Sequence, residues 1–114
     1  MSRAGWHGAF EGDRFVLARR LPVRWDVAAS CRMPRVSAPR LARAVRQDVW
    51  RALRRLRGFA PSVEIAPEGQ GLRVTAGGRV DGPLPRASVE ARLAELLACP
   101  VRRARWTAYA GPAR

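Results

Sequence analysis

Arginine dominates the chemistry available to this chain. All 22 basic residues are arginine, and they outnumber nine acidic residues to give a formal charge of +13 at pH 7. A guanidinium group forms paired hydrogen bonds with phosphate or carboxylate oxygens. An excess of positive charge attracts polyanions, whatever codon bias selected arginine over lysine. The sequence therefore indicates an anionic partner first.

The arginines are concentrated between Arg32 and Arg57, where nine of them accompany one acid, Asp48. Six fall outside the apolar stripe of a helix expected over residues 38–57, at Arg40, Arg43, Arg46, Arg51, Arg54 and Arg57. At about 100° per residue, these side chains point away from the core. Like charges three or four residues apart repel each other. A solvated face usually mixes both signs, so we favour a face that meets an anionic partner over a merely solvated one.

Trp50 falls at the same angle on this helix as the arginines. Either another part of the chain covers it, with arginines stacked on its ring, or it is an exposed platform for a base or a partner side chain. A smaller basic and aromatic cluster closes the chain and either docks the C-terminal segment on the core or extends the binding surface. The candidate binding residues are Arg40, Arg43, Arg46, Trp50, Arg51, Arg54, Arg57, Arg102, Arg103 and Trp106.

Patterns typical of catalytic and metal sites are missing from the sequence. His7 is the only histidine, and Cys31 and Cys99 lie far apart, outside any CxxC pair, so a zinc site of the usual Cys/His kind cannot be assembled in one chain. The glycines at 69 and 71 precede an expected strand rather than a helix, unlike a phosphate-binding loop. We expect a protein that is not an enzyme, without cofactor or metal, whose cysteines are small apolar residues.

Hydrophobic periodicity predicts the elements that position these residues. Alternation predicts a strand over residues 23–33, and residues 15–17 are a candidate start of an earlier one. Apolar residues three and four apart predict the helix over 38–57, with Ser37 as its N-cap and Gly58 as its stop. Alternating runs at 62–65 and 72–76 predict a hairpin, with a bulge or bend at Gly77-Gly78.

The C-terminal third is expected to be helical. Leucines at helical spacing predict a second helix over residues 86–98. Residues 101–110 form either a third helix, with Pro100 at its start and Gly111 as its cap, or a last strand. We favour the helix.

These elements predict an α+β fold in the order β-α-β-β-α, followed by a helix or a strand. It is a two-layer sandwich, with helices on one face of a mostly antiparallel sheet. A final strand would give the ferredoxin-like order. One domain is expected over residues 15–111, after a flexible leader over 1–14 and before a tail at 112–114. Membrane-spanning and signal-peptide runs are missing, so we expect a cytoplasmic location.

Two functional hypotheses follow from the sequence. The first is a nucleic-acid-binding domain, for DNA or RNA, that contacts phosphates and has weak sequence specificity. The alternative is a small adaptor or assembly subunit that docks on an acidic protein or within a larger complex, with Trp25, Trp50, Trp106 and Tyr109 as candidate anchors. Binding to an anionic membrane is disfavoured, because the core requires the apolar face of the helix.

Overall fold

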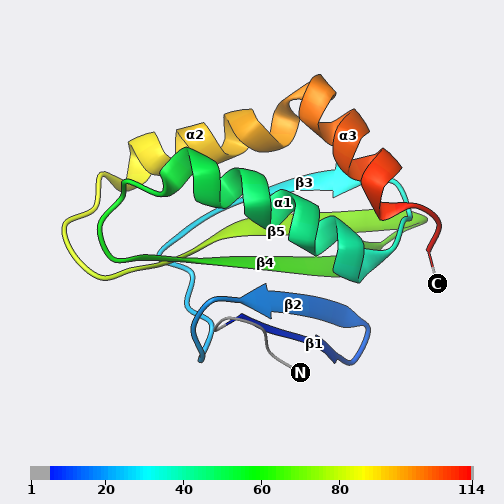
Figure 1. Ribbon diagram of the computed structural model, residues 1–114, viewed down its shortest axis with the longest axis horizontal. Coiled ribbons are helices and arrows are strands. Elements are labelled where there is room, and N and C mark those ends of the chain that lie inside the picture. The colour runs from blue at the N-terminus through cyan, green and yellow to red at the C-terminus, as the bar shows by residue number, and fades with distance from the viewer. Residues whose placement is uncertain (1–5, 114) are drawn as a thin grey trace.

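In residues 6–113, which the computed structural model describes, five antiparallel strands form one sheet and three helices cover one of its faces (Figure 1). The elements are β1 His7–Glu11, β2 Arg14–Ala18, β3 Val27–Met33, α1 Ala38–Leu53, β4 Phe59–Glu68, β5 Gly71–Val80, α2 Arg86–Ala98 and α3 Pro100–Ala110. The strands lie in the order β1-β2-β4-β5-β3. This arrangement confirms the predicted two-layer α+β sandwich.

The core lies between the sheet and the helices, because each element has one apolar side. Leu41, Val45 and Val49 of α1 are fully buried, as the predicted stripe requires. Val63 and Ile65 of β4 belong to the same buried cluster. Burying a side chain of this size contributes about 1.5–3 kcal/mol. One face of α1 is therefore fixed by the core, and the opposite face is left to polar residues.

The hairpin of β4 and β5 is confirmed, and both strands are longer than predicted. Gly77 and Gly78 do not end β5 in a bulge or bend, since pairing with β4 continues to Val80. A Cβ at Gly77 would overlap the backbone of Val27 on β3, and one at Gly78 would overlap the backbone of Ala60 on β4. The two glycines therefore allow three backbones to approach closely, a role that the sequence pattern did not distinguish from a bend.

Helix α1 ends at Leu53, four residues earlier than predicted. The chain then turns, and the Leu56 N–H donates to the Leu53 carbonyl oxygen at 2.9 Å. Gly58 follows with a φ of +71°, a left-handed conformation that favours glycine. Helix α2 has the predicted bounds. Residues 100–110 form helix α3, so the alternative of a last strand, with its ferredoxin-like order, is wrong.

The N-terminal segment is a strand over part of the stretch predicted as a flexible leader. His7–Glu11 form β1, which pairs along its whole length with β2. Glycine and isolated aromatic residues concealed this strand, because they give no clear alternation. The first five residues of the predicted leader lie outside the described residues. At the other end, Pro112 of the predicted tail pairs with Val36, and Arg114 lies outside the described residues.

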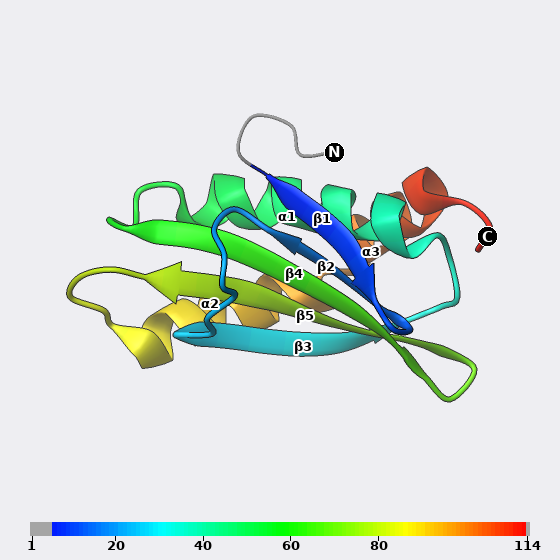
Figure 2. The ribbon, with the colours of Figure 1, turned by 90° about the horizontal axis from the view of Figure 1, so that it is seen from below.

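The predicted strand over residues 23–33 begins only at Val27. Strands β2 and β3 lie on opposite sides of the β4–β5 hairpin, so residues 19–26 must cross it. Figure 2 shows this segment passing over β4 and β5 on the side away from the helices. Its two ends are fixed by hydrogen bonds, from the Arg19 N–H to Pro61 at 3.0 Å and from the Asp26 N–H to Gly78 at 2.9 Å.

Candidate nucleic-acid interface

Acidic residues neutralise arginines mainly on the uncovered side of the sheet and at its rim. Asp81 pairs with Arg20 at 2.8 Å and with Arg24 at 3.1 Å. Hydrogen bonds from Arg79 and Arg20 lower the pKa of Asp81 despite the opposing effect of desolvation. Among the residues that the structure describes, arginines with a carboxylate within ion-pair distance are Arg14, Arg20, Arg24, Arg32, Arg73, Arg79, Arg86, Arg102 and Arg105.

The arginines of α1 and of the turn after it are absent from that set. In residues 6–113, the structure shows no carboxylate within ion-pair distance of Arg40, Arg43, Arg46, Arg51, Arg54, Arg55 or Arg57, which we call the α1 arginines. All but Arg46 are exposed. Arg54 and Arg57 follow the end of the helix rather than lying on it. The predicted outward cationic surface is therefore present, without internal neutralisation.

Aromatic rings accompany these arginines on both sides of α1. Trp50 is 45% exposed, so the possibility that the chain covers it is wrong. The Arg54 guanidinium carbon lies 5.8 Å from the Trp50 ring centroid, and that of Arg40 lies 5.3 Å from the ring of Tyr109, which is 51% exposed. Each contact is within the range of a cation–π interaction.

Arg46 is the most constrained of the α1 arginines. Its guanidinium carbon lies 4.6 Å from the ring centroid of Trp6, which also faces Arg19. Burial lowers the pKa of Arg46, and the adjacent charge of Arg43 lowers it further. The buried Nε of Arg46 has no hydrogen-bond acceptor among the described residues. A buried donor without an acceptor is costly.

For Trp106, the C-terminal cluster follows the first of its two predicted alternatives, in which the last segment docks on the core. Trp106 is only 1% exposed and donates its indole N–H to Asp48 Oδ2 at 2.7 Å. Arg103 donates to the carbonyl oxygens of Leu97 and Arg32. These two predicted binding residues instead hold α3 to the fold. Periodicity predicts a shared helix face for Arg102, Trp106 and Tyr109, and in the structure only Trp106 of these three is buried. Arg102 remains exposed, 3.9 Å from Asp48.

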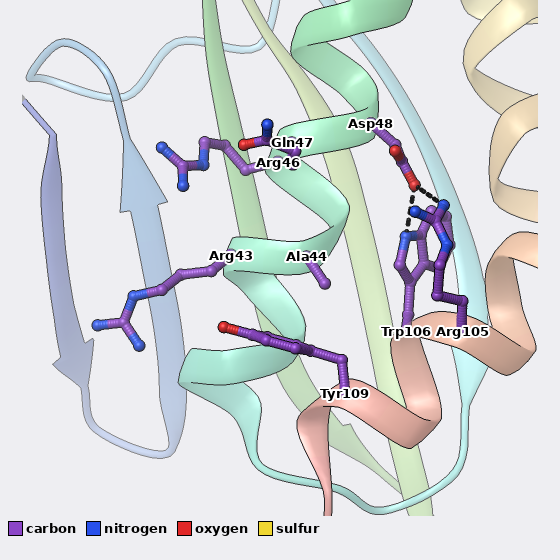
Figure 3. Close-up of a pocket in the computed structure, with 8 residues that line it drawn as sticks. All are labelled: Arg43, Ala44, Arg46, Gln47, Asp48, Arg105, Trp106 and Tyr109. Carbon is purple, nitrogen blue, oxygen red and sulfur yellow. Dashed lines mark hydrogen bonds and ion pairs between the residues drawn. The ribbon is translucent and has the colours of Figure 1, made fainter.

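Three of the hollows on the described surface border α1, and two of them are lined by Arg46. A groove of about 440 Å³ between α1 and α3 is lined by Arg43, Ala44, Arg46, Gln47, Asp48, Arg105, Trp106 and Tyr109 (Figure 3). On the other side of the helix, a hollow of about 260 Å³ is lined by Trp6, Arg19, Arg46, Gln47 and Trp50. In Figure 3, Arg43 and Arg46 reach toward the β1–β2 hairpin, whereas Asp48 turns to α3.

Sequence reasoning missed Trp6 and Gln47 as parts of this surface. Trp6 reaches α1 only because the β1–β2 hairpin lies at the edge of the sheet beside that helix, which is a tertiary relation. Gln47 had a local signal, since it follows Arg46 on the same helix. Tyr109 was predicted as a member of the C-terminal basic and aromatic cluster and as a possible protein-docking anchor, but not as a binding residue for nucleic acid.

Groups suited to metal binding or catalysis do not gather in the described part of the chain. In residues 6–113, no three His, Cys, Asp or Glu side chains are placed to hold a metal ion. His7 is exposed on β1. Cys31 and Cys99 are unpaired and half-buried, and desolvation raises the pKa of the Cys31 thiol. The chemistry that this surface offers is therefore binding of anions and stacking on aromatic rings.

Comparisons with protein-family models, with curated proteins and with solved structures find no match for this chain. In the part of the chain that the structure describes, no helix is both long enough and apolar enough to cross a membrane.

Proposed function

We propose that this protein is a non-enzymatic binding module for nucleic acid, which it contacts through the phosphates with weak sequence specificity. The main support is the set of seven α1 arginines that have no carboxylate partner among residues 6–113. Elsewhere in the described chain nine arginines pair with acids, and Arg92 and Arg103 donate to carbonyl oxygens. The α1 arginines form the group that keeps its positive charge open along one helix and the turn after it. A phosphate backbone supplies a row of negative charges that such a surface would neutralise.

The expected mode of binding follows from guanidinium chemistry. Each guanidinium can form two parallel hydrogen bonds with one phosphate. Contacts of this kind fix the position of the nucleic acid but do not read its sequence. We place this activity in the cytoplasm, because Cys31 and Cys99 are unpaired thiols, as expected in a reducing compartment.

The alternative, docking on an acidic protein or within a larger complex, has less support. Of the four proposed anchors, Trp106 is buried and Trp25 is half-buried. The two that are exposed, Trp50 and Tyr109, stand beside guanidinium groups rather than at the centre of an apolar patch. The core of a protein interface is usually depleted in charge. This composition favours a polyanion as the partner.

A matched pair of triple variants tests the proposal. One replaces α1 arginines (Arg43→Ala, Arg46→Ala, Arg54→Ala), and the other replaces ion-paired arginines (Arg32→Ala, Arg73→Ala, Arg86→Ala). Both lower the formal charge by three. Fluorescence anisotropy with a labelled oligonucleotide of about 12 nucleotides measures binding from about 50 to 200 mM salt. If the α1 variant loses three phosphate contacts, the slope of log K against log salt becomes shallower by about 2, and affinity near 0.1 M salt falls about 100-fold.

The control variant should retain most of the affinity, because its arginines already have carboxylate partners. Equal losses in the two variants would mean that net charge, and not the α1 surface, determines binding. Binding that does not change with salt would contradict phosphate contacts altogether. Retention of a defined acidic protein after nuclease treatment, without affinity for oligonucleotides, would establish the adaptor alternative instead.

A further inference from the structure

Two of the hollows beside α1, one toward α3 and one toward the β1–β2 hairpin, share Arg46 and Gln47. They therefore adjoin across the ridge of the helix. One end of this continuous path is bordered by Trp6 and Trp50, and the other by Tyr109. Three separate parts of the chain contribute to it, namely the β1–β2 hairpin, α1 and α3. We call this path the α1 crossing.

Every aromatic ring on the α1 crossing has a guanidinium beside it, except the buried ring of Trp106. Arg54 faces Trp50, Arg40 faces Tyr109, and both Arg19 and Arg46 face Trp6. Trp50 and Tyr109 each expose about half of their surface. Sites for anions and sites for planar rings therefore alternate along one surface.

A surface on which guanidinium groups alternate with exposed aromatic rings suits a single strand better than a duplex. Bases of a duplex are stacked on each other and offer a protein only their edges and the phosphates. Unpaired bases expose their faces and stack on aromatic side chains with little dependence on sequence, while arginines follow the backbone. A duplex would use the α1 arginines and leave the rings of Trp50 and Tyr109 without a partner.

Polar side chains at the middle of the α1 crossing add a second kind of contact. The buried Arg46 Nε lacks an acceptor among the described residues, and the exposed amide of Gln47 lines both hollows. An amide both donates and accepts hydrogen bonds, so Gln47 suits the edge of an unpaired base. Arg46 suits a phosphate or a base carbonyl oxygen.

We infer that the α1 crossing binds a single-stranded polynucleotide, with bases stacked on Trp50 and Tyr109 and the intervening phosphates on the α1 arginines. This inference rests on the proposed function and narrows its ligand to unpaired strands. The strand would cross α1 between the β1–β2 hairpin and α3.

The test compares ring-removing variants with variants that keep a ring. Anisotropy titrations measure the affinity of the full chain for labelled oligothymidylate, oligouridylate and a duplex, each of about 12 nucleotides or base pairs. We expect the unmodified chain to bind the single strands at least tenfold more tightly than the duplex. Trp50→Ala and Tyr109→Ala should each weaken single-strand binding about tenfold. Trp50→Phe and Tyr109→Phe should retain most of it, and the affinity for the duplex should stay within about twofold in all four variants.

Tryptophan fluorescence and thermal unfolding complement the titrations. Quenching of tryptophan fluorescence by oligothymidylate should be weaker in Trp50→Phe than in the unmodified chain, because a ring that stacks on a base has been replaced. Thermal unfolding of each variant checks that the fold is intact, and little change is expected because both rings are exposed. A titration with oligodeoxyuridylate, which differs from oligouridylate only in the sugar, shows whether the preferred sugar is ribose or deoxyribose.

Failure of this inference differs from failure of the proposed function. If strands and duplex bind equally, and removal of either ring changes nothing, the inference is wrong although phosphate binding by the α1 arginines stands. If none of the three oligonucleotides binds near 0.1 M salt, both are wrong. A titration with labelled polyglutamate completes the set. If polyglutamate binds and the three oligonucleotides do not, the surface recognises acidic protein, and both proposals about nucleic acid are overturned.

Discussion

Asp48 lies among arginines in the sequence, but in the structure its partners are residues of another helix. In the sequence it is the single negative charge among nine arginines. In the structure it is buried, accepts the Trp106 indole N–H, and pairs with Arg105 of α3. It therefore joins α1 to α3 and neutralises none of the α1 arginines. Its position on the helix gave no indication of this role, because the partner residues lie more than fifty positions away.

Removal of the Asp48 carboxylate should destabilise the fold. Asp48→Ala leaves the buried Trp106 N–H without an acceptor, which should lower the free energy of unfolding by about 2 kcal/mol. Asp48→Asn retains an acceptor and loses the charge, so we expect about half that loss. Urea denaturation followed by circular dichroism measures both. Glu95→Gln is the control, because Glu95 is exposed and has no ion pair in the described part of the chain. An equally large decrease in the free energy of unfolding of Glu95→Gln would contradict the role that we assign to Asp48.

At the scale of elements, local periodicity predicted the helices well and the N-terminal strands poorly. The apolar stripe of α1 was visible in the sequence because its residues recur at intervals of three and four, which places them on one face of a helix. The alternation from Val23 to Met33 was equally clear, yet only Val27–Met33 pair with β5. Residues 23–26 belong instead to the segment over residues 19–26 that crosses the hairpin, which we call the crossing segment. Alternating apolar and polar residues are found both in the extended crossing segment and in strand β3. Only the order of the strands in the sheet shows where one ends and the other begins.

The crossing segment should make stability depend on pH at the acid end. Arg24 and the Val80 N–H lower the pKa of Asp26, and Arg79 and Arg20 lower that of Asp81. Because both folded-state pKa values lie below the unfolded value, their contribution is fully present above about pH 4 and is lost as pH falls through the folded values. The free energy of unfolding should therefore decrease as the medium is acidified.

Urea denaturation across a pH series measures this dependence. Asp81→Asn should flatten it, because one of the two titrating carboxylates is gone. Asp13→Asn should leave it unchanged, since Asp13 has no ion pair among residues 6–113. An unchanged profile in Asp81→Asn would show that other groups cause the acid sensitivity.

For the whole molecule, the distribution of charge matters more than its total. The sequence predicted which arginines face outward from α1, because that depends on helical angles alone. It did not predict that the acids would pair mostly with arginines of the strands, of the crossing segment and of the later helices, since those pairs join residues far apart in the chain. It also placed Trp106 and Arg103 in the binding set, because burial of α3 is decided by packing. Candidate sites on one helix are therefore more predictable than sites that several elements build.

Unpaired positive charge on α1 should lower stability in dilute buffer. The side chains of Arg43 and Arg51 form no hydrogen bond or ion pair with the described residues. Each has like charges three or four positions away, such as Arg40 and Arg54. The double variant Arg43→Ala, Arg51→Ala relieves several repulsions of about 0.2–0.5 kcal/mol each, so its unfolding free energy at low ionic strength should rise by about 1 kcal/mol. Added salt screens the same repulsion.

This gain should shrink in about 0.5 M salt, where the unmodified chain itself becomes more stable. A second double variant, Arg20→Ala and Arg73→Ala, removes the same formal charge from arginines that are ion-paired, and it should not be stabilised at any salt concentration. Thermal and urea unfolding at low and high salt distinguish these cases. Equal stabilisation of the two double variants would mean that the chain responds to its total charge, whereas stabilisation confined to the first means that repulsion is concentrated on the surface left open for a polyanion.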